Sequence, residues 1–167
     1  MKWSRVYLIG FMGAGKTTVG QVLAGKLGWK FIDLDSAIEQ GEQRSVADIF
    51  RRNGEPHFRN LERKYLRRLS SEKRTIIALG GGTFIDHQNR DLAEKTGLTV
   101  WLKVSFAKAA GRVKIDGTRP KFGNAEQARQ LYESREPHYA VAKIHISTDE
   151  GTPETAANEI IGALRMS

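Results

Sequence analysis

Short apolar runs alternate with longer, helix-compatible segments along this chain. The runs have the composition of buried β-strands and span residues 6–9, 31–32, 75–79, 98–102 and 144–146. Strands that alternate with helices are typical of right-handed βαβ units, in which helices cover both faces of a parallel sheet. The pattern therefore predicts an α/β fold with a five-stranded parallel sheet, in a single domain covering residues 1–167.

Capping residues and prolines delimit several of the predicted helices. The hydroxyl of Ser45 suits the start of a helix that Gly54 ends, and Pro56 suits the first turn of the next helix. Another helix is expected at 17–27, after the first strand, and a closing helix at 152–166. The helices and strands follow one another without an interdomain linker.

The loop after the first predicted strand carries the most specific pattern in the chain. Residues 10–17, GFMGAGKT, match G-x-x-x-x-G-K-[ST] between a strand and a helix. Glycines let backbone N–H groups surround a phosphate, and the following helix presents its positive N-terminal end. Lys16 is placed to reach the β- and γ-phosphates, and the Thr17 hydroxyl is placed to bind Mg²⁺. The loop predicts a nucleoside triphosphate site but not its use.

Candidate catalytic groups follow the second and third predicted strands. Asp33 and Asp35 come after the second strand, and in an extended segment both side chains would face one site. The third strand runs into Gly80, Gly81 and Gly82, which let the backbone approach a ligand, and not into an aspartate. Asp33 is therefore the candidate acid for Mg²⁺. Asp35 can accept a proton from a substrate hydroxyl, and it also suits the N-cap of a helix at 37–40.

One segment interrupts the alternation of strands and helices. Residues 116–124, DGTRPKFGN, combine glycine, proline and charge, which predicts an exposed mobile loop. An enzyme that transfers a phosphoryl group needs a closable lid to exclude water, and this loop carries Arg119 and Lys121. We therefore predict a lid at about 112–124, with an ordinary connection as the alternative.

Composition narrows the environment and the partners. The chain has no cysteine, which excludes disulfides and thiolate metal sites and fits a reducing cytoplasm. It has no apolar run of membrane-spanning length and no signal peptide before the first strand, so we expect a cytoplasmic protein without a membrane partner. The formal net charge is +8, and much of the excess lies at 51–74 on a predicted helix with a solvated face. Because no aromatic series or RNA-binding signature accompanies this charge, we expect no nucleic-acid partner.

The chain resembles the shikimate kinases of the bacterial type over essentially its full length. The matching segments, in order, are GFMGAGKTTVG at 10–20, FIDLD at 31–35, SVADIF at 45–50, GE at 54–55, FRNLE at 58–62, GGG at 80–82, RP at 119–120, and LYESR at 131–135 followed by Tyr139. The resemblance implies a three-layer α/β/α P-loop NTPase fold, similar to that of nucleoside monophosphate kinases. It also implies a monomer that uses ATP to phosphorylate the 3-hydroxyl of shikimate in aromatic amino-acid biosynthesis.

The resemblance further implies roles for individual residues. The expected ATP contacts are Gly13, Ala14, Gly15, Lys16, Thr17, Thr18, Arg112 and Arg119. The expected shikimate contacts are Asp35, Arg59, Gly80, Gly81, Gly82 and Arg135, partly in a helical substrate-binding region at about 34–62. The expected catalytic residues are Asp35, Lys16 and Arg119, and the expected Mg²⁺ ligands are Thr17 and Asp33. Arginines suit the substrate carboxylate because a guanidinium donates two parallel hydrogen bonds.

Two segments depart from the family pattern, and three other functions compete. Lys121 and Phe122 stand where leucines commonly follow the lid arginine and proline, and the stretch 149–153 lacks the usual basic residue, so we assign no adenine contact there. A kinase for another hydroxylated acid, such as gluconate, fits the same arginines. A nucleotide-dependent regulatory module and a nucleic-acid motor are the remaining alternatives.

Overall fold

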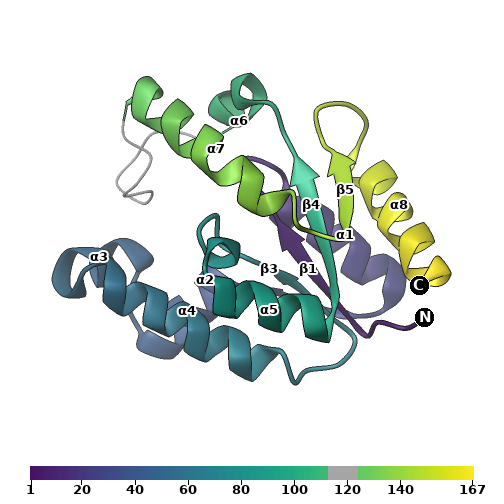
Figure 1. The fold of residues 1–167 in the computed structure, drawn as a ribbon. Helices are drawn as coiled ribbons and strands as arrows, with labels where there is room; N and C mark the ends of the chain where they lie inside the picture. The colour runs from purple at the N-terminus through teal and green to yellow at the C-terminus, as the bar shows by residue number, and fades with distance from the viewer. Residues whose placement is uncertain (113–123) are drawn as a thin grey trace.

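The computed structural model of this protein describes residues 1–112 and 124–167 (Figure 1). The lid predicted at about 112–124 lies outside these residues, apart from its two end positions. Arg119, Lys121 and Phe122 lie outside them as well, so the roles expected for these three residues rest on the sequence.

The centre of the fold is a five-stranded parallel sheet, which confirms the predicted fold class. The strand order is β2-β3-β1-β4-β5, and the strands are β1 (Arg5–Ile9), β2 (Lys30–Asp33), β3 (Thr75–Ala78), β4 (Leu98–Lys103) and β5 (Ile144–Ser147). In the register of the sheet, Asp33 lies beside Ala78, and Ala78 lies beside Leu8. The carboxyl ends of β2, β3 and β1 consequently meet at one end of the sheet, where α/β folds bind ligands.

Helices cover both faces of the sheet and complete three layers. Right-handed connections place the helix after β1 and the helices after β2, β3 and β4 on opposite faces, because the chain moves in opposite directions along the sheet. Accordingly α1 packs beside α8 on one face, whereas α4, α5 and α7 lie on the other (Figure 1). The helices are α1 (Lys16–Leu27), α2 (Leu34–Glu42), α3 (Val46–Asn53), α4 (Glu55–Leu69), α5 (His87–Thr96), α6 (Phe106–Arg112), α7 (Ala125–Tyr139) and α8 (Pro153–Met166), with a 3-10 turn, η1 (Thr83–Ile85), after β3.

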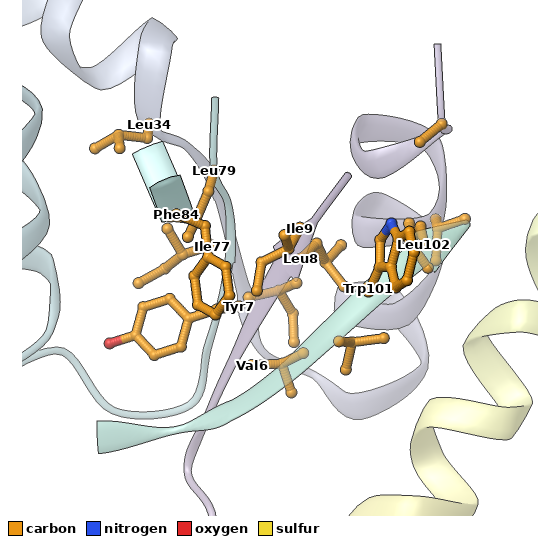
Figure 2. Packing of buried hydrophobic residues seen from close by; sticks show 14 of the residues in the cluster. Val6, Tyr7, Leu8, Ile9, Leu34, Ile77, Leu79, Phe84, Trp101 and Leu102 are labelled. Atoms are coloured by element: carbon orange, nitrogen blue, oxygen red, sulfur yellow. The ribbon is translucent and has the colours of Figure 1, made fainter. Parts of the chain in front are cut away.

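The core forms where β1 and its neighbours are covered on both sides. All five residues of β1 are buried, as are all four of β3, which is typical of central strands in a parallel sheet. Figure 2 shows side chains of β1 and β4 gathered with those of Ile77, Leu79 and Phe84 in one cluster. None of the helices in the described ranges is both long enough and apolar enough to cross a lipid bilayer. The core therefore supports a rigid sheet end on which loops carry the polar groups.

Local capping explains where the helices around this sheet end begin. The Ser45 side chain accepts a hydrogen bond from Asp48 N and starts α3, and Gly54 ends it, as the sequence predicted. Asp33 caps α2 in the same way, since its Oδ1 accepts from Ser36 N at 3.0 Å. The expectation that Asp35 caps a helix at 37–40 is therefore wrong.

The conformation expected between the two aspartates is also wrong. Asp33 is the last residue of β2, and Asp35 already lies in the first turn of α2, so the two do not share one extended segment. The directions of the two side chains therefore do not follow from the alternation of side chains along a strand.

Candidate active site

The loop between β1 and α1 has the shape that a phosphate site needs. Gly13 and Gly15 have φ values of 82° and 91°, a left-handed conformation that side chains rarely adopt. Gly15 occupies the N-cap of α1, where no side chain caps the helix. The first N–H groups of α1 therefore remain for an anionic ligand, next to the positive end of the helix. Thr17 and Thr18 are exposed at this end, and Lys16 donates from Nζ to the Gly10 carbonyl.

Hydrogen bonds from Arg112 and Thr148 hold the backbone of this loop. Arg112, at the end of α6, donates from Nη1 to the Gly13 carbonyl at 3.0 Å and from Nη2 to the Thr148 carbonyl at 2.9 Å. The Thr148 hydroxyl donates in turn to the carbonyl of Ala14 at 2.8 Å. Arg112, which we expected to contact ATP, thus contacts the loop itself. Thr148 was not expected to contribute to this loop.

A cavity of about 380 Å³ opens at the carboxyl ends of β1, β2 and β3. Its walls include Met12 from the phosphate loop, Asp33 at the end of β2, and the aromatic residues Phe50 and Phe58. They also include every residue expected to contact the substrate: Asp35, Arg59, Gly80, Gly81, Gly82 and Arg135. The fold therefore brings these positions together, from α2, α4, α7 and the segment after β3.

Each of the three glycines after β3 faces one of the charged side chains. A Cβ atom on Gly80 would lie 3.0 Å from Asp35 Oδ1, and one on Gly81 would lie 2.6 Å from Arg135 Nη1. A Cβ atom on Gly82 would lie 2.6 Å from both terminal nitrogens of Arg59. The triplet therefore leaves room for the three charged groups to approach the backbone, in addition to any role in approaching a ligand.

Arg59 is held in place by two carboxylates on its own helix. Its Nη1 lies 2.6 Å from Glu62 Oε1, and its Nη2 lies 3.3 Å from Glu55 Oε1. Burial lowers the pKa of Arg59, but the charges and hydrogen bonds of Glu62 and Glu55 outweigh it and raise that pKa above its ordinary value. Glu62 is itself fixed, because the buried Thr83 hydroxyl donates to its other oxygen. Glu62 and Thr83 were not expected to contribute, although an acid three residues after an arginine on a helix is a recognisable pairing signal.

Arg135 is in a different electrostatic position from Arg59. It is only 7% exposed, yet it pairs with no carboxylate in residues 1–112 and 124–167. Its guanidinium carbon lies over the ring of Phe11, 6.0 Å from the ring centroid. Burying an unpaired charge is costly, and an anion bound in the cavity offsets that cost. The arrangement favours a ligand with a carboxylate near Gly81.

Comparison with known proteins agrees with this geometry. The model of the shikimate kinase family matches residues 12–165. A shikimate kinase from Persephonella marina is 40% identical over 161 residues, which cover 96% of this chain and 98% of that protein. One from a Sulfurihydrogenibium species is also 40% identical over 161 residues, covering 96% and 97%. The chain belongs to the shikimate kinase family.

Solved structures of shikimate kinases have the same architecture. Shikimate kinase from Acinetobacter baumannii in complex with shikimate superimposes with a TM-score of 0.93 at 34% identity, covering 99% of this chain and 94% of that one. A deoxyadenosine kinase from M. mycoides superimposes with a TM-score of 0.62 at 19% identity and supports the fold alone. The fold class expected from the sequence is thereby confirmed.

Only two residues, Thr17 and Asp33, are expected to be protein ligands of Mg²⁺ in this member of the shikimate kinase family. No group of three or more histidine, aspartate or glutamate side chains suited to a metal ion occurs in the part of the chain that the structure describes. Mg²⁺ in phosphotransferases usually keeps several waters and takes one or two protein ligands plus phosphate oxygens. The Thr17 hydroxyl, in the first turn of α1, and the half-buried Asp33 carboxylate, at the end of β2, fit this type of site.

Proposed function

We propose that this protein transfers the γ-phosphoryl group of ATP to the 3-hydroxyl of shikimate, giving shikimate 3-phosphate and ADP. The observation that carries the proposal is a cavity lined by Asp35, Arg59 and Arg135, in which the buried Arg135 pairs with no carboxylate of residues 1–112 and 124–167. Such a cavity suits a small acid that presents a carboxylate to the arginines and hydroxyls to the aspartate. Membership of the shikimate kinase family supports the same substrate.

On the donor side, the phosphate loop and its neighbours are proposed to bind ATP. The N–H groups of the loop and of the first turn of α1, between Gly13 and Thr18, and the Lys16 ammonium would hold the phosphates, although the Ala14 N–H also donates to the Phe11 carbonyl at 3.1 Å. Arg119 is proposed to close over them from the lid, and Arg112 supports the loop through the Gly13 carbonyl. Mg²⁺, held by Thr17 and Asp33, neutralises phosphate charge when it is bound.

On the acceptor side, Asp35 is proposed to orient the attacking hydroxyl. As the oxygen of that hydroxyl forms a bond to the γ-phosphorus, the bond from phosphorus to the β-phosphate oxygen breaks, and the hydroxyl proton passes to the Asp35 carboxylate. Arg59 and Arg135 would hold the carboxylate at the other end of the substrate. Asp35 at one end and the two arginines at the other would thus fix a rigid ring, and the attacking hydroxyl would be presented in line with the γ-phosphate.

We further propose that the protein acts as a cytoplasmic monomer with small-molecule substrates and without a nucleic-acid or membrane partner. All the proposed site residues come from one chain, so a second copy is not needed to complete the cavity. A single domain over residues 1–167, with a lid at about 112–124 and a substrate-binding region at about 34–62, is part of the same proposal.

A coupled assay of ADP release tests the acceptor. Shikimate, gluconate, nucleoside monophosphates and single-stranded DNA are offered separately with ATP and Mg²⁺, and a reaction without acceptor measures ATP hydrolysis. Turnover that depends on shikimate supports the proposal. Turnover with gluconate instead, or hydrolysis that no acceptor increases, contradicts it.

A further inference from the structure

The segment after β3 carries backbone groups of the substrate cavity, so its conformation has to be fixed. Within the segment, Thr83 N donates to the Gly80 carbonyl at 3.1 Å, and Ile85 N donates to the Gly82 carbonyl at 3.3 Å. The carbonyl between these two, that of Gly81, is bound from outside the segment. It accepts a hydrogen bond of 2.5 Å from the Tyr139 hydroxyl on α7.

Tyr139 is well suited to hold this carbonyl as a permanent donor. It is 1% exposed, and its ring lies 6.0 Å from that of Trp101, centroid to centroid. Burial raises the pKa of Tyr139 to about 12, against the opposing effect of the nearby Arg135 and Arg59 charges. The hydroxyl therefore stays protonated at neutral pH, and its single proton is committed to the Gly81 carbonyl.

The same hydroxyl lies close to the Arg135 guanidinium. Tyr139 and Arg135 are four residues apart on α7, so both side chains lie on one face of the helix. A Cβ atom on Gly81 would lie 2.6 Å from Arg135 Nη1 and 3.6 Å from the Tyr139 hydroxyl oxygen. Arg135, the Gly81 backbone and the Tyr139 hydroxyl thus meet at one junction in the cavity wall.

The peptide between Gly81 and Gly82 transmits this contact. In a planar trans peptide the carbonyl and the N–H point in opposite directions. When Tyr139 holds the Gly81 carbonyl, it therefore also sets the direction of the Gly82 N–H, on the side away from Tyr139. Glycines rotate easily about their backbone bonds, so without this contact the peptide would sample several orientations.

We propose that Tyr139 is a positioning residue for the carboxylate end of the substrate. It fixes the peptide plane between Gly81 and Gly82 and the distance of this peptide from Arg135, but it does not touch the reacting atoms. The inference rests on the proposed function for the identity of the substrate. Whether Tyr139 holds the glycine segment does not depend on that function, and it can be measured in the protein without a substrate.

Tyr7 provides a matched control for removing a buried hydroxyl. It is fully buried, its hydroxyl lies 2.7 Å from Thr96 Oγ1, and burial raises its pKa as well. It belongs to the core around β1 and does not line the cavity. Tyr7→Phe and Tyr139→Phe therefore remove the same group from equally buried positions, and only Tyr139→Phe releases the glycine segment.

Two measurements on both full-length variants test the proposal. Hydrogen exchange of the ligand-free protein, followed in a peptide spanning residues 80–84, should accelerate in Tyr139→Phe and remain at the wild-type rate in Tyr7→Phe. The KM for shikimate should rise about tenfold in Tyr139→Phe, the size expected for one lost buried hydrogen bond, whereas kcat and the KM for ATP stay within about twofold.

The outcomes separate the inference from the proposed function. Unchanged exchange at 80–84 in Tyr139→Phe overturns the inference, and so does equal acceleration in Tyr7→Phe, which would show general loosening. A fall in kcat with an unchanged KM for shikimate overturns the assignment to the carboxylate end. If wild-type protein does not turn over shikimate, the proposed function fails, and the exchange comparison still decides whether Tyr139 holds the segment.

Discussion

Replacing Gly82 by alanine tests the arrangement of the cavity with a single methyl group. Gly82 has φ −99° and ψ −8°, which alanine adopts without strain, so the change acts through space and not through the backbone. The new Cβ atom would lie 2.6 Å from Arg59 Nη1 and Nη2, which is 0.8 Å less than the 3.4 Å at which ordinary contact begins. The Arg59 guanidinium must therefore retreat from the cavity wall by nearly an ångström.

The size of the effect follows from the contacts that Arg59 would lose. A guanidinium that moves this far cannot keep its 2.6 Å contact with Glu62 or its aim at the substrate carboxylate. A misplacement of about 1 Å costs on the order of 100-fold in rate, or about 2.7 kcal/mol. We therefore expect kcat/KM for shikimate to fall about 100-fold in Gly82→Ala, with an unchanged dissociation constant for ATP.

Steady-state kinetics and nucleotide titration measure these quantities, with Gly25→Ala as the matched control. Gly25 lies inside α1, and a Cβ atom there would meet nothing within 4 Å. Alanine at this position should leave the kinetics unchanged and stabilise the fold by about 0.5–1 kcal/mol. If Gly82→Ala had the same kinetic constants for shikimate as the wild type, the reasoning would be refuted. Activity would then not depend on the position of the Arg59 guanidinium in the structure.

Three further changes address the remaining parts of the account. Asp35→Asn should lower kcat about 100-fold or more while the dissociation constant of ATP stays within about twofold, and near-normal turnover would remove Asp35 from the mechanism. Thr148→Val removes the hydroxyl that donates to the Ala14 carbonyl, so the KM for ATP should rise about fivefold and the KM for shikimate should not change, as steady-state kinetics will show. Asp86 pairs with Arg63 and caps α5; although burial raises its pKa, Arg63 and the cap lower that pKa overall. Its contribution to stability is therefore complete above the unfolded pKa of about 4 and is lost as pH falls through the lower folded pKa. Urea unfolding should accordingly show a difference between wild type and Asp86→Asn that shrinks as the pH falls below about 4.

The elements that depend on local patterns could be predicted from the sequence. The phosphate loop lies between a buried strand and a helix because its glycines and the flanking apolar periodicity are encoded within about 20 residues. The start of α3 at Ser45 and its end at Gly54 likewise need only a hydroxyl and a flexible residue at the right spacing. The alternation of apolar runs with helical segments likewise predicted a five-stranded parallel sheet, although it did not give the order of the strands.

The contacts that complete the cavity could not be predicted in this way. Tyr139 is 58 residues from the Gly81 carbonyl that it binds, and Thr148 is 134 residues from Ala14. Such pairs depend on how helices pack over the sheet, and no local spacing encodes them. The error at Asp35 has a local cause, because α2 begins directly after β2 and Asp33 serves as its cap. The expected alternation of an extended segment therefore ends at Asp33.

The most direct test of the central claim is a two-dimensional ¹H–³¹P correlation spectrum of the product formed from ATP and shikimate. One new phosphomonoester resonance is predicted, whose phosphorus couples to the proton on C3 of the ring, because Asp35, which lines the same cavity as Arg59 and Arg135, is proposed to orient the 3-hydroxyl. ADP formed without a phosphomonoester, or a phosphorus coupled to the proton of another ring carbon, would contradict it.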